Sequence, residues 1–122
     1  MVCAIERPFA AVYAEVRHEV REALIDTARR RRFISYSDLV ARVKAFKLRP
    51  DDSRLHALLD EISTAENAAG RGLLTIVVVH RSGDMMPGRG FFELARFHGR
   101  DVRNQEKFWS SEVAHVFETW KK

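Results

Sequence analysis

Segments with a helical period dominate this sequence, and one run of β-branched residues interrupts them. "LLTIVVVH", residues 73–80, is apolar up to its histidine apart from one threonine, a composition typical of a buried strand. Before and after it, apolar residues recur at spacings of three and four, which is the period of an amphipathic helix. The sequence therefore predicts a mainly α protein of the α+β class, with a small β-sheet built around residues 73–79.

Two helices and a short strand are predicted in the first part of the chain. The first helix is expected over residues 8–30, because its apolar positions have helical spacing and proline suits a first helical turn. The pair Phe33–Ile34 is strand-like. A second helix is expected to begin after Ser35, which has the spacing of a capping box with Asp38, and its apolar pattern continues to Phe46.

The remaining helices follow the break "KLRPDDS". Pro50 disfavours helix at the preceding residue, so a third helix is expected over residues 53–69, ended by the glycines that follow it. "FFELARFHG" predicts a short helix. Residues 108–120 predict a C-terminal helix that packs on the core through one aromatic face. "MMPGRG" fits either a second strand or a loop. No repeat and no long linker divides the chain, so a single domain over residues 1–122 is expected.

The composition argues against several classes of protein. Charged residues make up 31% of the chain, and no apolar run approaches the ~20 residues of a membrane span. The first residues show no signal-peptide pattern and Cys3 is the single cysteine, which favours a reducing, cytoplasmic location. The histidines lack metal-ligand spacing and no nucleotide or nucleophile motif is present, so no metal, cofactor or catalytic residue is predicted. A site assembled in space from Glu61 or Glu66 with His80 stays open, as does a structural ion pair between Glu66 and Arg71.

Positive charge is concentrated in one central block. Residues 29–54 hold nine basic and three acidic residues, whereas residues 55–70 hold no lysine or arginine. A clustered basic surface attracts polyanions such as nucleic acids, although "ARRRRF" fits a solvated helix end equally well, because cations favour a helix C-terminus. The candidate phosphate contacts are Arg29, Arg30, Arg31, Arg32, Arg42, Lys44, Lys47, Arg49, Arg54, Arg81 and Arg89.

"GDMMPGRGFFEL", residues 83–94, contains a second candidate site. Gly88 and Gly90 allow the backbone to adopt positive φ, and a helix is expected to begin at Phe91. A helix start that follows a glycine-rich loop can bind an anion through its unpaired N–H groups, and Arg89 would lie beside it as a bidentate partner. The candidate anion-binding loop is thus Gly88, Arg89, Gly90 and Phe91. The alternative is a tight connector in which Phe91 and Phe92 fill the core.

"ISYSDLVARV", residues 34–43, resembles the strand-then-helix opening of the helix-turn-helix domain in alkylguanine DNA alkyltransferases and alkyltransferase-like proteins, where a "TYG-x-(I/L)-A" string recurs. The element order is that of a winged helix-turn-helix, and the resemblance implies such a core over about residues 30–95. "VVHR" stands where that family has Pro-Cys-His-Arg, so the cysteine nucleophile is missing and alkyl transfer is not expected. Residues 34–95 are also similar to small bacterial proteins that share a "GRPLL…VV…PGxGFF" pattern, which supports the fold rather than an activity.

The favoured interpretation is a non-enzymatic nucleic-acid-binding module, with DNA as the expected partner and backbone phosphates as the contacts. The predicted reading helix over residues 53–69 has Asp60, Glu61 and Glu66 at outer positions and only Arg54 as a cation. That acidity favours either backbone binding through other elements or no DNA at all. The alternative is a protein-interaction or accessory domain that binds another protein or a second copy of itself, and a small enzyme ranks third.

Overall fold

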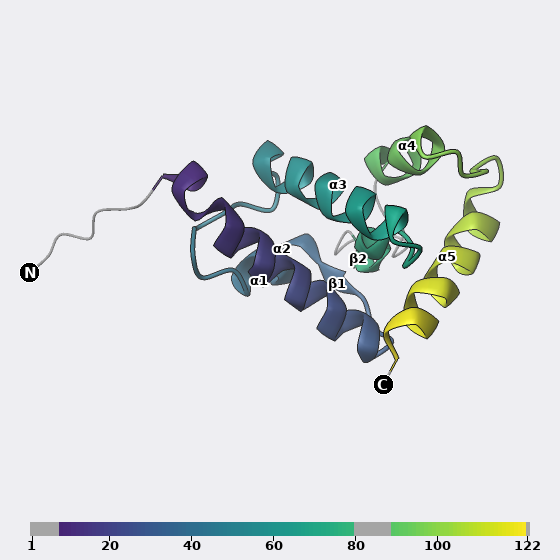
Figure 1. The fold of residues 1–122 in the computed structure, drawn as a ribbon, viewed down its shortest axis with the longest axis horizontal. Coiled ribbons are helices and arrows are strands. Elements are labelled where there is room, and N and C mark those ends of the chain that lie inside the picture. The colour runs from purple at the N-terminus through teal and green to yellow at the C-terminus, as the bar shows by residue number, and fades with distance from the viewer. Residues whose placement is uncertain (1–7, 80–88, 122) are drawn as a thin grey trace, which may run out of the picture.

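The computed structural model describes residues 8–79 and 89–121, with Arg89 described by its backbone only. In chain order the elements are α1 (Phe9–Arg29), β1 (Ile34–Ser35), α2 (Tyr36–Ala41), α3 (Ser53–Ala68), the 3₁₀ helix η1 (Leu74–Val77), β2 (Val78–Val79), α4 (Arg89–Phe97) and α5 (Gln105–Trp120) (Figure 1). The described part of the chain is thus mainly helical with one small two-stranded sheet, which confirms the predicted class.

The first helix matches its prediction closely. Pro8 is the N-cap of α1, with φ −65°, the angle that the proline ring fixes and that a helix start requires. Val16, Val20 and Leu24 are fully buried on one face, as the spacing of three and four predicts. That face holds α1 against the rest of the core.

The second helix is shorter than its apolar pattern suggests. Ser35 accepts a hydrogen bond from the backbone N–H of Asp38 at 3.1 Å, so the predicted cap is present. The helix nevertheless ends at Ala41, and the expected continuation to residue 46 is wrong. The backbone N–H groups of Lys44 and Ala45 donate instead to the Glu19 carboxylate of α1, at 3.1 and 2.9 Å. This tertiary contact replaces the helical hydrogen bonds, and local periodicity cannot reveal it.

The β-branched run is only partly a strand. Residues 74–77 form η1 and only Val78 and Val79 form β2, which pairs in parallel with β1 in the register Ile34↔Val78 and Ser35↔Val79. The prediction of a strand throughout residues 73–79 is therefore wrong for its first part. The backbone N–H of Thr75 donates to the Ser63 hydroxyl of α3 at 3.1 Å, and the run is buried throughout. The apolar composition indicates only that the segment is buried, and a buried 3₁₀ helix fits it as well as a buried strand does.

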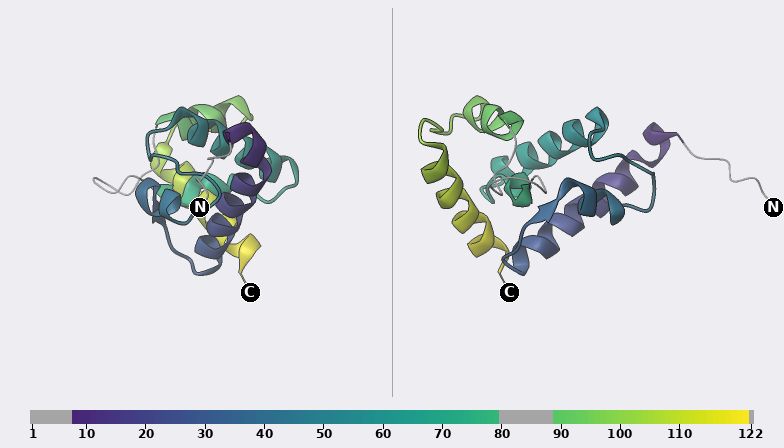
Figure 2. Two further views of the ribbon diagram at one scale, coloured as in Figure 1. Left: turned by 90° about the vertical axis from the view of Figure 1, so that its left-hand side faces the viewer. Right: turned by 180° about the vertical axis from the view of Figure 1, so that it is seen from behind.

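The element η1 lies at the centre of the fold, in contact with α1, α3 and α5. Figures 1 and 2 show the C-terminal end of α5 beside the C-terminal end of α1, while the other ends of the two helices diverge. Phe33, just before β1, stacks on Trp109 of α5 with ring centroids 5.5 Å apart. The connection after α1 is therefore attached to the last helix of the chain.

The short helix α4 ends as predicted, with Gly99 at φ +80° after its last turn. It begins two residues earlier than expected, at Arg89. Phe91 and Phe92 are buried beside Phe108 of α5, with ring centroids 6.2 and 6.3 Å from it. Residues 80–88, which include the expected turn and the open choice between strand and loop in "MMPGRG", lie outside the described residues.

Candidate nucleic-acid interface

Four consecutive arginines form the end of α1 and the turn after it. Arg29 is the last helical residue, Arg30 is the C-cap, and Arg31 has a left-handed backbone with φ 55°. The N–H of Arg31 donates to the Ala28 carbonyl at 3.0 Å and the N–H of Arg32 donates to the Thr27 carbonyl at 3.1 Å. This pair of bonds is a Schellman motif, which satisfies the last carbonyls of the helix. All four arginines are exposed.

Two other helices end in the same motif, and they show that Arg31 is exceptional. After α3 and α4 the left-handed position is occupied by Gly70 and Gly99, both at φ +80°. A left-handed backbone costs about 1–2 kcal/mol in a residue with a Cβ and nothing comparable in glycine. At the end of α1 the chain thus has an arginine where its other two motifs have glycine.

The residue after the left-handed position also distinguishes the three helix ends, although it is an arginine in each. Arg71, after α3, bonds the buried Glu66, and Arg100, after α4, bonds the buried Glu112. Arg32, after α1, has no ion pair with any residue in the described part of the chain. Two of these arginines therefore stabilise the fold, whereas Arg32 extends into solvent.

The turn that carries the arginines is rigidly held. Phe33 follows them directly and packs on two aromatic rings of α5, Trp109 and Phe117, with centroids 5.5 and 5.7 Å away. Arg31 also lies near α5, with its guanidinium 3.8 Å from the Glu118 carboxylate. The Schellman bonds fix the turn from one side and the aromatic contacts fix it from the other.

The structure divides the predicted basic block into paired and unpaired cations. Asp26 of α1 pairs with both Arg30, at 3.1 Å, and Arg42, at 3.2 Å. Hydrogen bonds from Arg30 first, and then from Arg42, hold the pKa of Asp26 below its usual value. Arg49 pairs with Asp51 at 3.2 Å. The charges of these three predicted contacts are consequently compensated by neighbours.

The remaining cations of the block are exposed and unpaired among the residues that the structure describes. They are Arg29, Arg32, Lys44 and Lys47, since the other two, Arg31 and Arg54, pair with Glu118 and Asp52. Arg29 and Arg42 line one shallow surface hollow on α1 together with the acids Glu19, Glu22 and Asp26. Acids therefore lie beside Arg29 and Arg42 along the helix flank, whereas Arg32, beyond the end of α1, has no ion pair with a described residue.

The predicted reading helix, α3, carries little positive charge. Arg54 is its one cation, and it is compensated by the N-cap Asp52 at 2.8 Å and lies over the rings of Phe9 and Phe46, at 5.1 Å from each. Asp60 is exposed on the same helix. Since a helix that enters a DNA groove is flanked by phosphates, α3 is poorly suited to that position.

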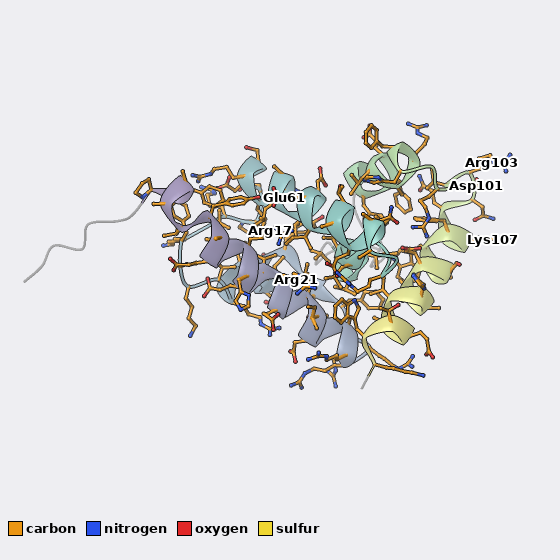
Figure 3. The ribbon with its side chains drawn as sticks, in the orientation of Figure 1. Arg17, Arg21, Glu61, Asp101, Arg103 and Lys107 are labelled. Atoms are coloured by element: carbon orange, nitrogen blue, oxygen red, sulfur yellow. The ribbon has the colours of Figure 1, made fainter. Side chains whose placement is uncertain are left out.

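Two acidic residues of α3, Glu61 and Glu66, form ion pairs with arginines. Glu61 accepts hydrogen bonds from Tyr13 at 2.6 Å and from Arg17 at 2.7 Å, both on α1 (Figure 3). Glu66, 3% exposed, accepts from Arg71 at 2.8 Å and from Arg21 of α1 at 3.3 Å. Hydrogen bonds from Arg71 first, and from Arg21, lower the pKa of Glu66. The structural ion pair of Glu66 with Arg71 is present as one of the two alternatives, and His80 lies outside the described residues.

The predicted anion-binding loop is only partly described. Gly88 and the whole of Arg81 lie outside the described residues, as does the side chain of Arg89. Gly90 is the second residue of α4 and does not have positive φ, so the expectation of a flexed glycine there is wrong. Phe91 is buried, in agreement with the connector alternative, and anion binding at the start of α4 stays a prediction.

Glu112 is a structural centre that the sequence interpretation missed. It is 2% exposed, accepts from the backbone N–H of Leu73 at 2.7 Å, and bonds the guanidinium of Arg100 through both carboxylate oxygens. A signal was available, because Glu112 stands four residues after Phe108 and four before Val116 and so falls on the inner face of its helix. Its partners are Leu73, just before η1, and Arg100, in the α4–α5 connection, and nothing in the sequence indicated either contact.

Comparison with known proteins adds no relative to this geometry: no family model, no curated protein and no solved structure matches the chain. Within residues 8–79 and 89–121, no helix has both the length and the apolar character needed to cross a bilayer. In the same residues, His, Cys, Asp and Glu side chains do not gather in threes as a metal site would require.

Proposed function

We propose that this chain binds nucleic acid, with double-stranded DNA as its partner, through backbone phosphates that contact the arginine turn Arg29–Arg32. The observation that supports this most is the use of a strained arginine, Arg31, at the position where α3 and α4 are followed by glycine. Strain that persists in a well-packed region is often associated with function. Here it presents a further guanidinium at a rigid, exposed helix end.

The chemistry of the turn suits phosphate. Arginine binds phosphate oxygens bidentately and is always charged. The exposed pairs of Arg30 with Asp26 and of Arg31 with Glu118 are weak in water, so a phosphate can replace either carboxylate at little cost. Arg29 and Arg32 have no described partner to lose. Since the turn is held by Phe33 against α5, little backbone conformational entropy is lost on binding.

The same features argue for contacts to the backbone and against reading of bases. The helix α3 presents Asp60 and no uncompensated cation, so it offers neither phosphate contacts on its flanks nor arginines for guanine edges. Lys44 and Lys47, in the loop before α3, supply secondary phosphate contacts in this proposal. We therefore expect binding with little sequence preference. The winged-helix arrangement and a cytoplasmic location are part of the same proposal.

Fluorescence anisotropy with a labelled mixed-sequence duplex at low salt tests the proposal. The double variant Arg29→Ala/Arg32→Ala should weaken binding about tenfold or more, since two charge-assisted contacts are lost. The matched control is Arg103→Ala/Lys107→Ala, which removes the same charge from exposed positions at the other end of α5. It should bind nearly as the wild type does. Equal weakening by both variants would show that binding depends on net charge and not on the arginine turn. No binding by the wild type would refute the proposal.

A protein-interaction domain is the second candidate, and one observation favours it. Phe97, at the end of α4, is 83% exposed, which is unusual for a large aromatic side chain and typical of contact surfaces when it is part of a patch. Sedimentation of the wild type and of Phe97→Ser over a range of concentrations tests self-association through this ring. This candidate would be favoured over the first if the wild type forms a dimer that Phe97→Ser dissociates and if the protein binds no duplex.

A further inference from the structure

The carboxylate of Glu118 connects the C-terminal ends of α1 and α5. Its Oε1 atom accepts a hydrogen bond from the Lys121 ammonium at 2.5 Å, and its Oε2 atom lies 3.8 Å from Nη2 of Arg31. Arg31 follows α1 and Lys121 follows α5, and Figures 1 and 2 both show these two helix ends side by side. Two cations that are far apart in the sequence therefore meet at one anion.

The packing of neighbouring residues holds both cations in place. The turn that carries Arg31 is fixed by its Schellman bonds and by its aromatic contacts with α5. Trp120, the residue before Lys121, has the guanidinium groups of Arg21 and Arg71 over its ring, at 5.6 and 5.8 Å from the centroid. The last turn of α5 is thus attached to α1 and to the segment after α3. The approach of the two cations does not depend on Glu118 alone.

The three charged groups do not cancel one another. Two cations face one carboxylate, a formal excess of one positive charge. A hydrogen bond and the positive charge from Lys121, and then the charge of Arg31, hold the pKa of Glu118 below its usual value, so this carboxylate is ionised at neutral pH. More than half of each of the three side chains is exposed. Since exposed ion pairs are weak, an anion from solution can compete for both cations.

The contact has the charge and the oxygen atoms of a bound phosphodiester. A phosphodiester carries one negative charge and two non-bridging oxygens, and the Glu118 carboxylate presents one charge and two oxygens to the same pair of cations. Guanidinium and ammonium groups both bind phosphate oxygens. Glu118 stays 3.8 Å from the Arg31 guanidinium, beyond hydrogen-bond distance. A phosphate from outside can approach more closely, so it is the better partner for Arg31.

We infer that Glu118 occupies a phosphodiester site formed by Arg31 and Lys121, and that a backbone phosphate of the duplex displaces it. The inference rests on the proposed function and extends it in two ways. Lys121, which lies far outside the basic block of residues 29–54, becomes a phosphate contact. Glu118 becomes an intramolecular competitor that weakens duplex binding.

Fluorescence anisotropy with the full chain and the mixed-sequence duplex tests this inference. Glu118→Gln keeps the size of the side chain and removes its charge, so it should bind the duplex about three- to fivefold more tightly than the wild type does. Lys121→Ala should weaken binding by a similar factor and reduce the salt slope by about one. Because the two residues act at one site, Glu118→Gln should increase affinity less when Lys121 is already alanine.

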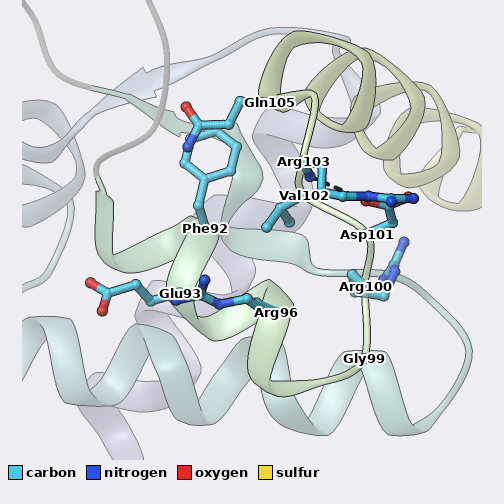
Figure 4. A pocket seen from close by; sticks show the side chains of 9 residues that line it. All are labelled: Phe92, Glu93, Arg96, Gly99, Arg100, Asp101, Val102, Arg103 and Gln105. Atoms are coloured by element: carbon cyan, nitrogen blue, oxygen red, sulfur yellow. Dashed lines mark hydrogen bonds and ion pairs between the residues drawn. The ribbon is translucent and has the colours of Figure 1, made fainter.

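The other end of α5 supplies the matched controls. Glu106→Gln and Lys107→Ala make the same changes of charge at exposed positions there (Figure 3). The nearby arginines have a different arrangement: Arg103 pairs with Asp101 at 2.8 Å, and Figure 4 shows Arg96 and Arg103 extending to opposite sides of the pocket that they line. Each control should change duplex affinity by less than about twofold.

Equal gains in affinity from Glu118→Gln and Glu106→Gln would overturn the inference, because Glu118 would then contribute only net charge. Equal affinities of Lys121→Ala and Lys107→Ala would overturn it as well. In both cases a wild type that binds the duplex leaves the proposed function standing. If neither the wild type nor Glu118→Gln binds, the proposed function fails and the inference fails with it. The melting temperatures of all four variants should stay close to that of the wild type, since the positions are exposed.

Discussion

Replacing Glu112 by glutamine perturbs the fold at one atom and leaves its shape unchanged. In the wild type, one carboxylate oxygen accepts from the Leu73 N–H and from Arg100 Nη1, at 2.7 and 3.2 Å, and the other oxygen accepts from Arg100 Nη2. A glutamine can keep its oxygen toward Leu73. Its NH₂ group then faces the guanidinium, donor against donor, and the charge that balances Arg100 is gone.

The magnitude follows from these contacts and from exposure. Removing one partner of a buried ion pair typically costs about 3–5 kcal/mol, and a hydrogen bond to a charged group is worth about 1.5–3 kcal/mol. The Arg100 side chain is 30% exposed, so water and the Asn67 amide, 3.1 Å from its Nη1, compensate part of the loss. We therefore expect Glu112→Gln to lower the free energy of unfolding by about 2–3 kcal/mol. For a domain of this length that loss lowers the melting temperature by roughly 10 °C.

Thermal and urea denaturation at neutral pH measure this effect, and Glu118→Gln on the same helix is the matched control. Glu118→Gln is the same chemical change at an exposed position, because Glu118 pairs with Lys121 at 2.5 Å and with Arg31 at 3.8 Å on the surface. Exposed pairs contribute little, so the melting temperature of the control should stay close to that of the wild type. Equal melting temperatures for the two variants would refute the role given to Glu112.

Three further substitutions test other parts of the account. Arg31→Gly should raise stability by about 0.5–1 kcal/mol, because it relieves the left-handed strain, and should weaken duplex binding; a loss of stability in urea melts would contradict the strain. Gly90→Ala should be tolerated or stabilising by roughly 0.5 kcal/mol, since an added Cβ meets nothing within 4 Å; a fall in melting temperature would show that Gly90 is not helical. Glu66→Gln should destabilise the protein at neutral pH and progressively less in acid. The native state lowers the pKa of Glu66, so the ionised carboxylate stabilises the fold above about pH 4.5, and this contribution is lost as the pH falls through the native-state pKa. An equal loss of stability at neutral pH and in acid would exclude this ion pair.

The helices that sequence predicts best are those whose stability comes from one periodic face. The inner face of α1, with Val16, Val20 and Leu24 fully buried, follows directly from spacing. The errors arise where tertiary contacts compete with local preference. Glu19 takes the backbone N–H groups that would have extended α2, and Ser63 takes that of Thr75 within the β-branched run. Neither contact can be predicted from the local sequence.

The basic block shows the same limit for function. A count of charges cannot tell which arginines are compensated, since Asp26 lies on a different element from Arg42 and meets it only in the fold. Position in the fold separates Arg42, Arg49 and Arg54, which are paired, from Arg32, which is not. The sequence predicted the segment in which positive charge is concentrated. The ion pairs of the structure then limit the proposed main phosphate contacts to the arginine turn.

The salt dependence of duplex binding tests the central proposal most directly. If the arginine turn replaces counterions at about four phosphates, the logarithm of the association constant should fall with the logarithm of salt concentration with a slope of about −3.5, on any duplex sequence. Arg29→Ala/Arg32→Ala should reduce that slope by about two, near one for each lost contact. A slope that this variant leaves unchanged would contradict the account, because the phosphates would then be bound elsewhere on the protein.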